Sequence, residues 1–86
     1  MRWGAMPSSV IRRFAWRRQE QALDIEFVTG RIYRYRGVPE EVAQGMRRVL
    51  SKGGYFNRAI RDHYPCDRLS FWPADGPSPE LAWRSD

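Results

Sequence analysis

Arginine and tyrosine alternate in Arg31-Ile32-Tyr33-Arg34-Tyr35-Arg36, and these two residue types together can bind nucleic acid. Tyrosine rings stack on unpaired bases, and guanidinium groups neutralise the phosphates beside them. The competing interpretation is structural, because tyrosines two positions apart on a strand share one face and can belong to the core. The pairing of this stretch with its neighbours decides between the two.

A second candidate is Ser51-Lys52-Gly53-Gly54, where glycines could expose backbone N–H groups to a phosphate at the start of a helix. It is not a Walker motif, which needs a longer glycine-framed loop after a strand. A helix cap and a tight turn explain the same residues, and we favour that interpretation. The residues that would hold a small anion, phosphate or carboxylate, are Lys52, Gly53, Gly54 and Asn57.

Residue types that catalyse reactions are scarce. His63 is expected on the surface near a helix end, and the adjacent Asp62 points to another helical face. Cys66, the single cysteine, cannot form a disulfide within the chain, which fits a reducing cytoplasm, and no obvious base accompanies it. One histidine and one cysteine cannot build a conventional zinc site. We therefore expect a binding module with no catalytic residue, metal or cofactor.

The charge distribution indicates a class of partner. The 86 residues have a net charge of +5 and a pI near 10.1. Residues 1–65 hold 13 basic and 6 acidic groups, whereas residues 66–86 hold 2 and 4. A basic body with an acidic tail is typical of a surface that faces a polyanion, although a solvated arginine-rich face has the same composition. No apolar run approaches the ~20 residues of a membrane span, and no signal peptide is recognisable.

Hydrophobic patterning predicts the strands that position these residues. Residues 10–17, 23–28 and 31–36 are expected to form an antiparallel meander. A three-residue loop with Gly30 in the left-handed conformation would pair Ile25 with Tyr33. A two-residue loop would instead put arginines on the apolar face, so we prefer the first register. Both tyrosines then face the core, and the arginines Arg34 and Arg36, with Arg12, form a positive stripe on the opposite, solvated face.

Two helices are expected after the strands. Val38-Pro39 opens the first, and the glycines of residues 51–54 are expected to end it with a left-handed cap. The second is expected over residues 55–64, before Pro65. The inward stripe of the first helix is Val42, Met46, Val49 and Leu50, and that of the second is Phe56, Ala59, Ile60 and Tyr64.

The two ends of the chain have other compositions. Residues 1–7 are expected to be a disordered leader, in which Met6 is an alternative start to Met1. Residues 66–86 are rich in proline and show no helical period. Within them, 69–72 is expected to be a short strand or to lie on the core, and 78–86 to be flexible. The chain therefore divides into a leader, one domain over 8–65 and a partly ordered tail.

The motifs, in this order and spacing, resemble the KTSC domain, a module named for the C-terminal extension of certain lysyl-tRNA synthetases that also occurs as small bacterial proteins. The matching segments are Phe27-Val28-Thr29-Gly30, Tyr33-Arg34-Tyr35, Val38-Pro39, Ser51 to Asn57, Ile60, Arg61 and Tyr64-Pro65. The resemblance suggests RNA binding through the synthetase context. The motif residues with a mainly structural role are Tyr33, Tyr35, Phe56, Asn57 and Ile60.

These observations predict an α+β domain, a three-stranded antiparallel meander followed by two short helices on one face, with a flexible C-terminal tail. The expected function is RNA binding in the cytoplasm through arginine–phosphate contacts. The alternative is a protein-interaction module that uses a sheet edge or the exposed Trp3, Trp72 and Trp83. The residues expected to contact nucleic acid are Arg12, Arg31, Arg34, Arg36, Lys52, Arg58 and Arg61.

Overall fold

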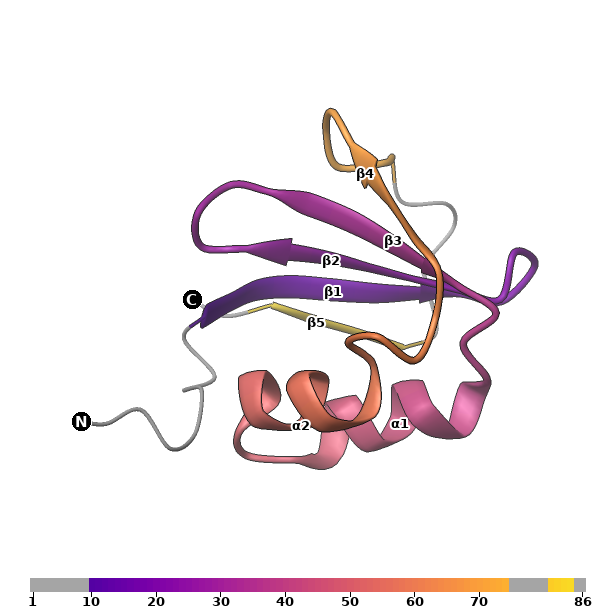
Figure 1. Ribbon diagram of the computed structural model, residues 1–86, viewed down its shortest axis with the longest axis vertical. Coiled ribbons are helices and arrows are strands. Elements are labelled where there is room, and N and C mark those ends of the chain that lie inside the picture. The colour runs from indigo at the N-terminus through magenta and orange to yellow at the C-terminus, as the bar shows by residue number, and fades with distance from the viewer. Residues whose placement is uncertain (1–9, 75–80, 85–86) are drawn as a thin grey trace.

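The computed structural model describes residues 10–74 and 81–84. Alternating apolar residues build the three central strands, β1 (Ile11–Arg17), β2 (Ala22–Phe27) and β3 (Ile32–Arg36), which form the predicted antiparallel meander. Two helices, α1 (Glu40–Arg48) and α2 (Lys52–Ala59), cover one face of the sheet (Figure 1). We call the other face the outer face.

The turn between β2 and β3 sets the register. Gly30 has a φ of +95°, and its N–H donates to the carbonyl of Phe27 at 2.8 Å. The N–H of Phe27 donates in turn to the carbonyl of Arg31 at 2.9 Å. Ile25 therefore pairs with Tyr33, and the predicted three-residue loop is confirmed.

The two motif tyrosines lie on the helix side of the sheet. Tyr35 is only 7% exposed, and Tyr33 is half-buried against the same core. The ring of Tyr35 meets Phe56 of α2 edge-on at a centroid distance of 5.4 Å. Burial raises the pKa of the Tyr35 hydroxyl, and the Cys66 thiol beside it acts in the same direction. Both tyrosines thus face the core, as the predicted register requires.

The first helix is shorter than predicted. It begins after Pro39, and two acidic residues in its first turn favour the helix dipole. It ends at Arg48, because Val49 is already extended, with a ψ of 152°. Leu50 is 94% exposed, so the predicted stripe is wrong at that position. The predicted Met46 is buried and Val42 packs against the core, and Ala43 is a further inward residue that the predicted stripe did not include.

The second helix begins earlier than predicted. The side chain of Ser51 accepts a hydrogen bond from the N–H of Gly54 at 3.3 Å and so caps α2, which starts at Lys52. Both glycines lie in the first turn of α2 and not in a left-handed cap, so that prediction is wrong. The helix ends at Ala59, five residues before the predicted end, and a turn containing Asp62 with a φ of +65° follows.

The tail adds two strands, so the predicted three-stranded sheet is wrong in its strand number. β4 (Cys66–Leu69) pairs with β3, and β5 (Leu81–Arg84) pairs with β1, which gives the order β4-β3-β2-β1-β5. Two four-residue segments of the tail thereby cover both edges of the meander. Residues 81–84 are therefore ordered, contrary to the prediction of a flexible end.

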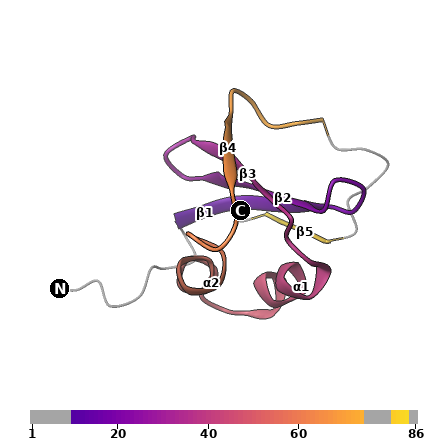
Figure 2. The same cartoon turned by 45° about the vertical axis from the view of Figure 1, so that its right-hand side comes forward.

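β4 and β5 lie at opposite edges of the sheet. Figure 2 shows the two helices on one side and the segment after β4 on the other. Trp72 of this segment lies over the guanidinium group of Arg13, on the outer face. The predicted leader, with Trp3, and residues 75–80 and 85–86 lie outside the described residues.

Candidate binding site on the outer face of the sheet

A buried carboxylate lies in the middle of the outer face. Asp24 is fully buried, and Arg17 donates through Nε to its Oδ2 at 3.0 Å. Arg34 donates to both carboxylate oxygens, at 2.7 Å from Nε and 3.0 Å from Nη2. This hydrogen bond is the main reason why the pKa of Arg34 is raised. Asp24 thus fixes two arginines in the sheet.

The other members of the predicted positive stripe also have acidic partners. Arg36 lies 3.0 Å from Asp67 of β4, and Arg12 lies 3.9 Å from Glu26. Half of the Arg36 side chain is still exposed. The stripe is therefore largely neutralised rather than free, and its role in binding stays a prediction.

The predicted anion-binding residues do not converge on one point. Lys52 is buried, and its Nζ donates to the carbonyl oxygens of Arg47 at 2.9 Å and Val49 at 2.6 Å. Burial, together with the charge of Arg47, lowers the pKa of this ammonium group. Lys52 thus binds the carboxyl end of α1, whereas Asn57 is exposed on α2 and accepts from Arg61 at 3.1 Å.

The remaining predicted arginines lie apart from one another. Arg31 is exposed in the turn before β3, and the guanidinium group of Arg58 lies 5.4 Å from the ring centre of Tyr55. Neither has an acidic partner within the residues that the structure describes. They add positive charge to the surface without forming a cluster.

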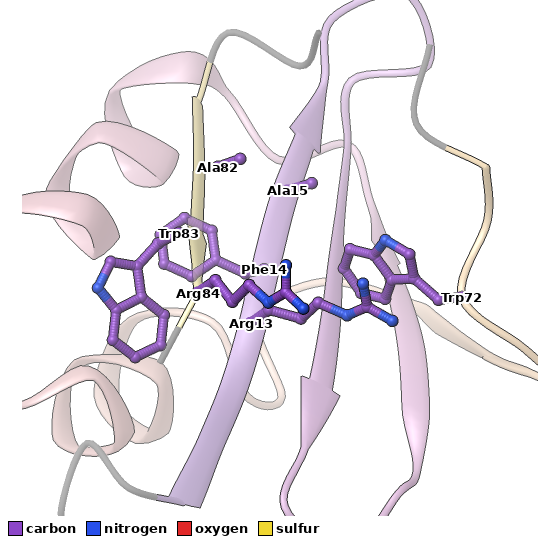
Figure 3. A pocket seen from close by; sticks show the side chains of 7 residues that line it. All are labelled: Arg13, Phe14, Ala15, Trp72, Ala82, Trp83 and Arg84. Atoms are coloured by element: carbon purple, nitrogen blue, oxygen red, sulfur yellow. The ribbon is translucent and has the colours of Figure 1, made fainter. Parts of the chain in front are cut away.

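An open groove of about 230 Å³ lies where β1, β5 and the segment after β4 meet. Figure 3 shows its lining, in which Arg84, Arg13 and Trp72 lie in a row, with Ala15 of β1 and Ala82 of β5 to one side of them. Ala15 pairs directly with Ala82, and the next pair on the same face of the sheet, two positions along, is Arg13–Arg84. Small residues on neighbouring strands thus leave the space that the larger side chains enclose.

The groove presents hydrogen-bond donors beside an aromatic ring. The guanidinium carbon of Arg13 lies 4.1 Å from the ring centre of Trp72, while its Nε donates to Glu26 at 2.6 Å. Arg84 is exposed and has no acidic partner among residues 10–74 and 81–84. Within the same residues, the buried indole N–H of Trp72 lacks an acceptor. Such a site suits an anion attached to a flat ring.

Sequence patterns do not identify this groove, because its residues come from three distant segments. Trp72 and Trp83 were expected to be exposed interface residues, yet both are partly buried. Trp83 stacks on Phe14 at a centroid distance of 5.8 Å. The one signal was the short run Leu-Ala-Trp-Arg at residues 81–84, which has the alternation of a strand.

Other kinds of site find little support in the described part of the chain. No three histidine, cysteine, aspartate or glutamate side chains there lie close enough to share a metal ion. Neither α1 nor α2 is long and apolar enough to cross a membrane.

A family model described as the KTSC domain matches residues 7–64. Three individual proteins are also similar to this chain. An uncharacterized protein from Stutzerimonas stutzeri is 38% identical over 61 residues, 70% of this chain and 86% of that protein. A lysine–tRNA ligase from Nostoc punctiforme is 37% identical over 62 residues, 72% of this chain but only 11% of the ligase. The crystal structure of a KTSC domain protein from Yersinia pestis superposes with a TM-score of 0.68 and 30% identity, covering 76% of this chain and 92% of that one.

Proposed function

The chain belongs to the KTSC domain family, and on this premise we propose that it is an RNA-binding module. The observation that carries the proposal is the outer-face groove, where Arg13, Arg84 and the ring of Trp72 border one space. Two further facts support it. The chain has a net charge of +5, and one of its relatives, matched over 11% of that protein's length, is a lysine–tRNA ligase, whose name includes an RNA substrate.

In this proposal the groove holds one nucleotide of a single strand. Arg84 has no acidic partner within the described residues, and its guanidinium group donates two hydrogen bonds to two oxygens of one phosphate. The base stacks against the side chains of Arg13 and Trp72, which lie on each other. Flat aromatic and guanidinium groups can stack on any of the bases. Since both contacts ignore the base edges, sequence preference is weak.

The arginines predicted from sequence have a secondary role in the proposal. Arg31 and Arg58 are exposed and attract the RNA at long range. Arg34 is held by Asp24, so it contributes less to a phosphate contact than its position on a basic strand suggests. The main contacts therefore lie at the β1–β5 side of the outer face.

The test is a titration of the isotopically labelled chain with tRNA, single-stranded RNA and single-stranded DNA at low salt. We expect amide shifts in residues 13–15 and 82–84 and an affinity that falls steeply as salt is added. Arg84→Glu should weaken binding by more than about tenfold, since it removes a charge-assisted hydrogen bond.

Arg48→Glu is the matched control. Arg48 is exposed on α1, away from the groove, and its substitution changes the net charge by the same amount as Arg84→Glu. An equal loss in both variants would mean that binding depends on overall charge and not on the groove. If no amide moves with any of the three nucleic acids, the protein does not bind them and the proposal fails.

A further inference from the structure

Trp72 covers arginines of the outer face from a segment that is weakly held. The centre of its ring lies 4.1 Å from the guanidinium carbon of Arg13 and 5.7 Å from that of Arg17. No backbone hydrogen bond joins residues 71–74 to the rest of the chain that the structure describes. The neighbouring Phe71 is 75% exposed, so this segment lies at the surface and not in the core.

The indole N–H of Trp72 is buried, and no acceptor for it lies among residues 10–74 and 81–84. A buried donor of this kind has lost its hydrogen bond to water without gaining another. The ring is therefore held by its contacts with the arginines and not by a hydrogen bond. An outward movement of the ring would let its N–H reach an acceptor. Residues 71–74 thus have the properties of a lid.

Arg13, in contrast, is fixed independently of this segment. Its Nε donates to Oε1 of Glu26 at 2.6 Å, and the Glu26 side chain is only 14% exposed. The N–H groups of a guanidinium lie in its plane, so this hydrogen bond leaves the face of the group available for stacking. If Trp72 moves outward, Arg13 stays in place and presents a flat surface to a ligand.

The groove is small for a ligand site. Its volume of about 230 Å³ lies below the roughly 300–1,000 Å³ of pockets that take drug-sized molecules. Arg84, Arg13 and Trp72 follow one another along it, and Arg84 comes from a different strand than Arg13 (Figure 3). Such a space suits one flat ring next to one anionic group, and not a run of stacked bases.

We infer, on the basis of the proposed function, that Trp72 is a lid that admits one RNA base between its ring and the guanidinium group of Arg13. The phosphate of the same nucleotide then contacts Arg84. Because both faces of the base are covered by protein, the base cannot also stack on its neighbours in the RNA. The ligand is therefore an RNA with an unpaired, extruded nucleotide, as in a bulge, rather than a regular duplex or a stacked strand.

Two RNA duplexes test the inference on the wild-type chain. They have the same base pairs, and one of them carries a single-nucleotide bulge. The bulged duplex should bind at least about tenfold more tightly, because its extra base enters the groove without the loss of a base pair. In spectra of the 15N-labelled chain, the indole N–H signal of Trp72 should shift with the bulged duplex and stay in place with the regular one.

Three substitutions in the lid test the role of the ring. Trp72→Ala should lower the affinity for the bulged duplex on the order of tenfold, to that for the regular one, because one of the two stacking surfaces is lost. Trp72→Phe keeps an aromatic ring and should keep the preference. Phe71→Ala is the matched control, since it removes an exposed ring at the next position and should change neither affinity. Amide spectra establish that each variant is folded.

The outcomes separate this inference from the proposed function. Equal affinity of the wild type for the two duplexes would overturn the inference, while a loss of RNA affinity in Arg84→Glu would still support binding in the groove. A gain in affinity for both duplexes in Trp72→Ala would also overturn it, because the ring would then only obstruct Arg13. If the wild type binds neither the duplexes nor single-stranded RNA, the proposed function itself fails.

Discussion

At the scale of single residues, the arginines are of two kinds. Some are held by a buried carboxylate in the sheet, and others have an exposed guanidinium group that can contact a ligand. Arg17 and Arg34 belong to the Asp24 cluster, in which a fully buried carboxylate accepts from both. Arg84 lies at the rim of the groove and is exposed. An arginine-rich sequence therefore contains both kinds, and only their partners tell them apart.

This difference gives a prediction about stability. Asp24→Asn should lower the free energy of unfolding by about 3–5 kcal/mol, because it leaves two partly buried guanidinium groups without their carboxylate. Denaturant unfolding measures the change. The control is Asp67→Asn, which removes an exposed pair with Arg36 and should cost about 0–1 kcal/mol. Similar losses in the two variants would show that the Asp24 cluster contributes no more than a surface ion pair.

At the scale of elements, the two helices approach each other closely at a glycine. A Cβ atom on Gly45 of α1 would overlap the ring of Tyr55 in α2, whose hydroxyl donates to the carbonyl of Val42 at 3.0 Å. The tyrosine is fixed by this hydrogen bond, so it cannot move aside without losing it. Gly45 is thus needed for the packing of α1 on α2.

The expected effect of Gly45→Ala is a net loss of about 1 kcal/mol in unfolding free energy. Overpacking costs about 1–3 kcal/mol and outweighs the ~1 kcal/mol that alanine gains in helix propensity. A double-mutant cycle with Tyr55→Ala checks the cause, because the loss should disappear when the ring is absent. A loss that persists in the Tyr55→Ala background would point to another contact.

The elements that local signals specify were predicted from sequence, and those that depend on distant contacts were not. The β2–β3 register was predictable because the turn at Gly30 and the alternation of apolar residues agree. The end of α1 was not, since it coincides with carbonyl contacts from Lys52 in the next helix. β5 was missed because proline-rich flanks suggested a loop, and its partner β1 lies far away in the sequence.

The groove could not be predicted for the same reason. Arg13, Trp72 and Arg84 share no local motif, and only the strand order brings them together. The basic composition nevertheless indicated the class of partner that we propose, because net charge does not depend on the fold.

At the scale of the whole molecule, β5 places side chains on both faces of the sheet. Its Ala82 and Arg84 line the outer-face groove, while the ring of Trp83 is anchored on the other side of the sheet. Detachment of β5 from β1 would therefore also remove Arg84 from the groove, and under the proposed function RNA binding would weaken.

A complementation experiment tests this connection. RNA binding should be weaker in the Trp83→Ala chain, whose Arg84 is no longer held, and should recover when the peptide of residues 79–86 is added. The same peptide carrying Arg84→Glu should bind the edge of β1 without restoring RNA affinity. Anisotropy of labelled RNA and of labelled peptide measures the two events separately. Equal recovery with both peptides, or recovery with neither while both bind, would separate the groove from β5.

The strand order also has a consequence for the order of events during synthesis. β1 to α2 leave the ribosome before β4 and β5, which come last in the sequence and cover the two edges of the meander. Until then the nascent domain presents two open strand edges, the feature through which chains aggregate. The two edge strands thus end the period in which this small domain is most exposed to wrong partners, and for the β1 edge that moment arrives only with Leu81–Arg84.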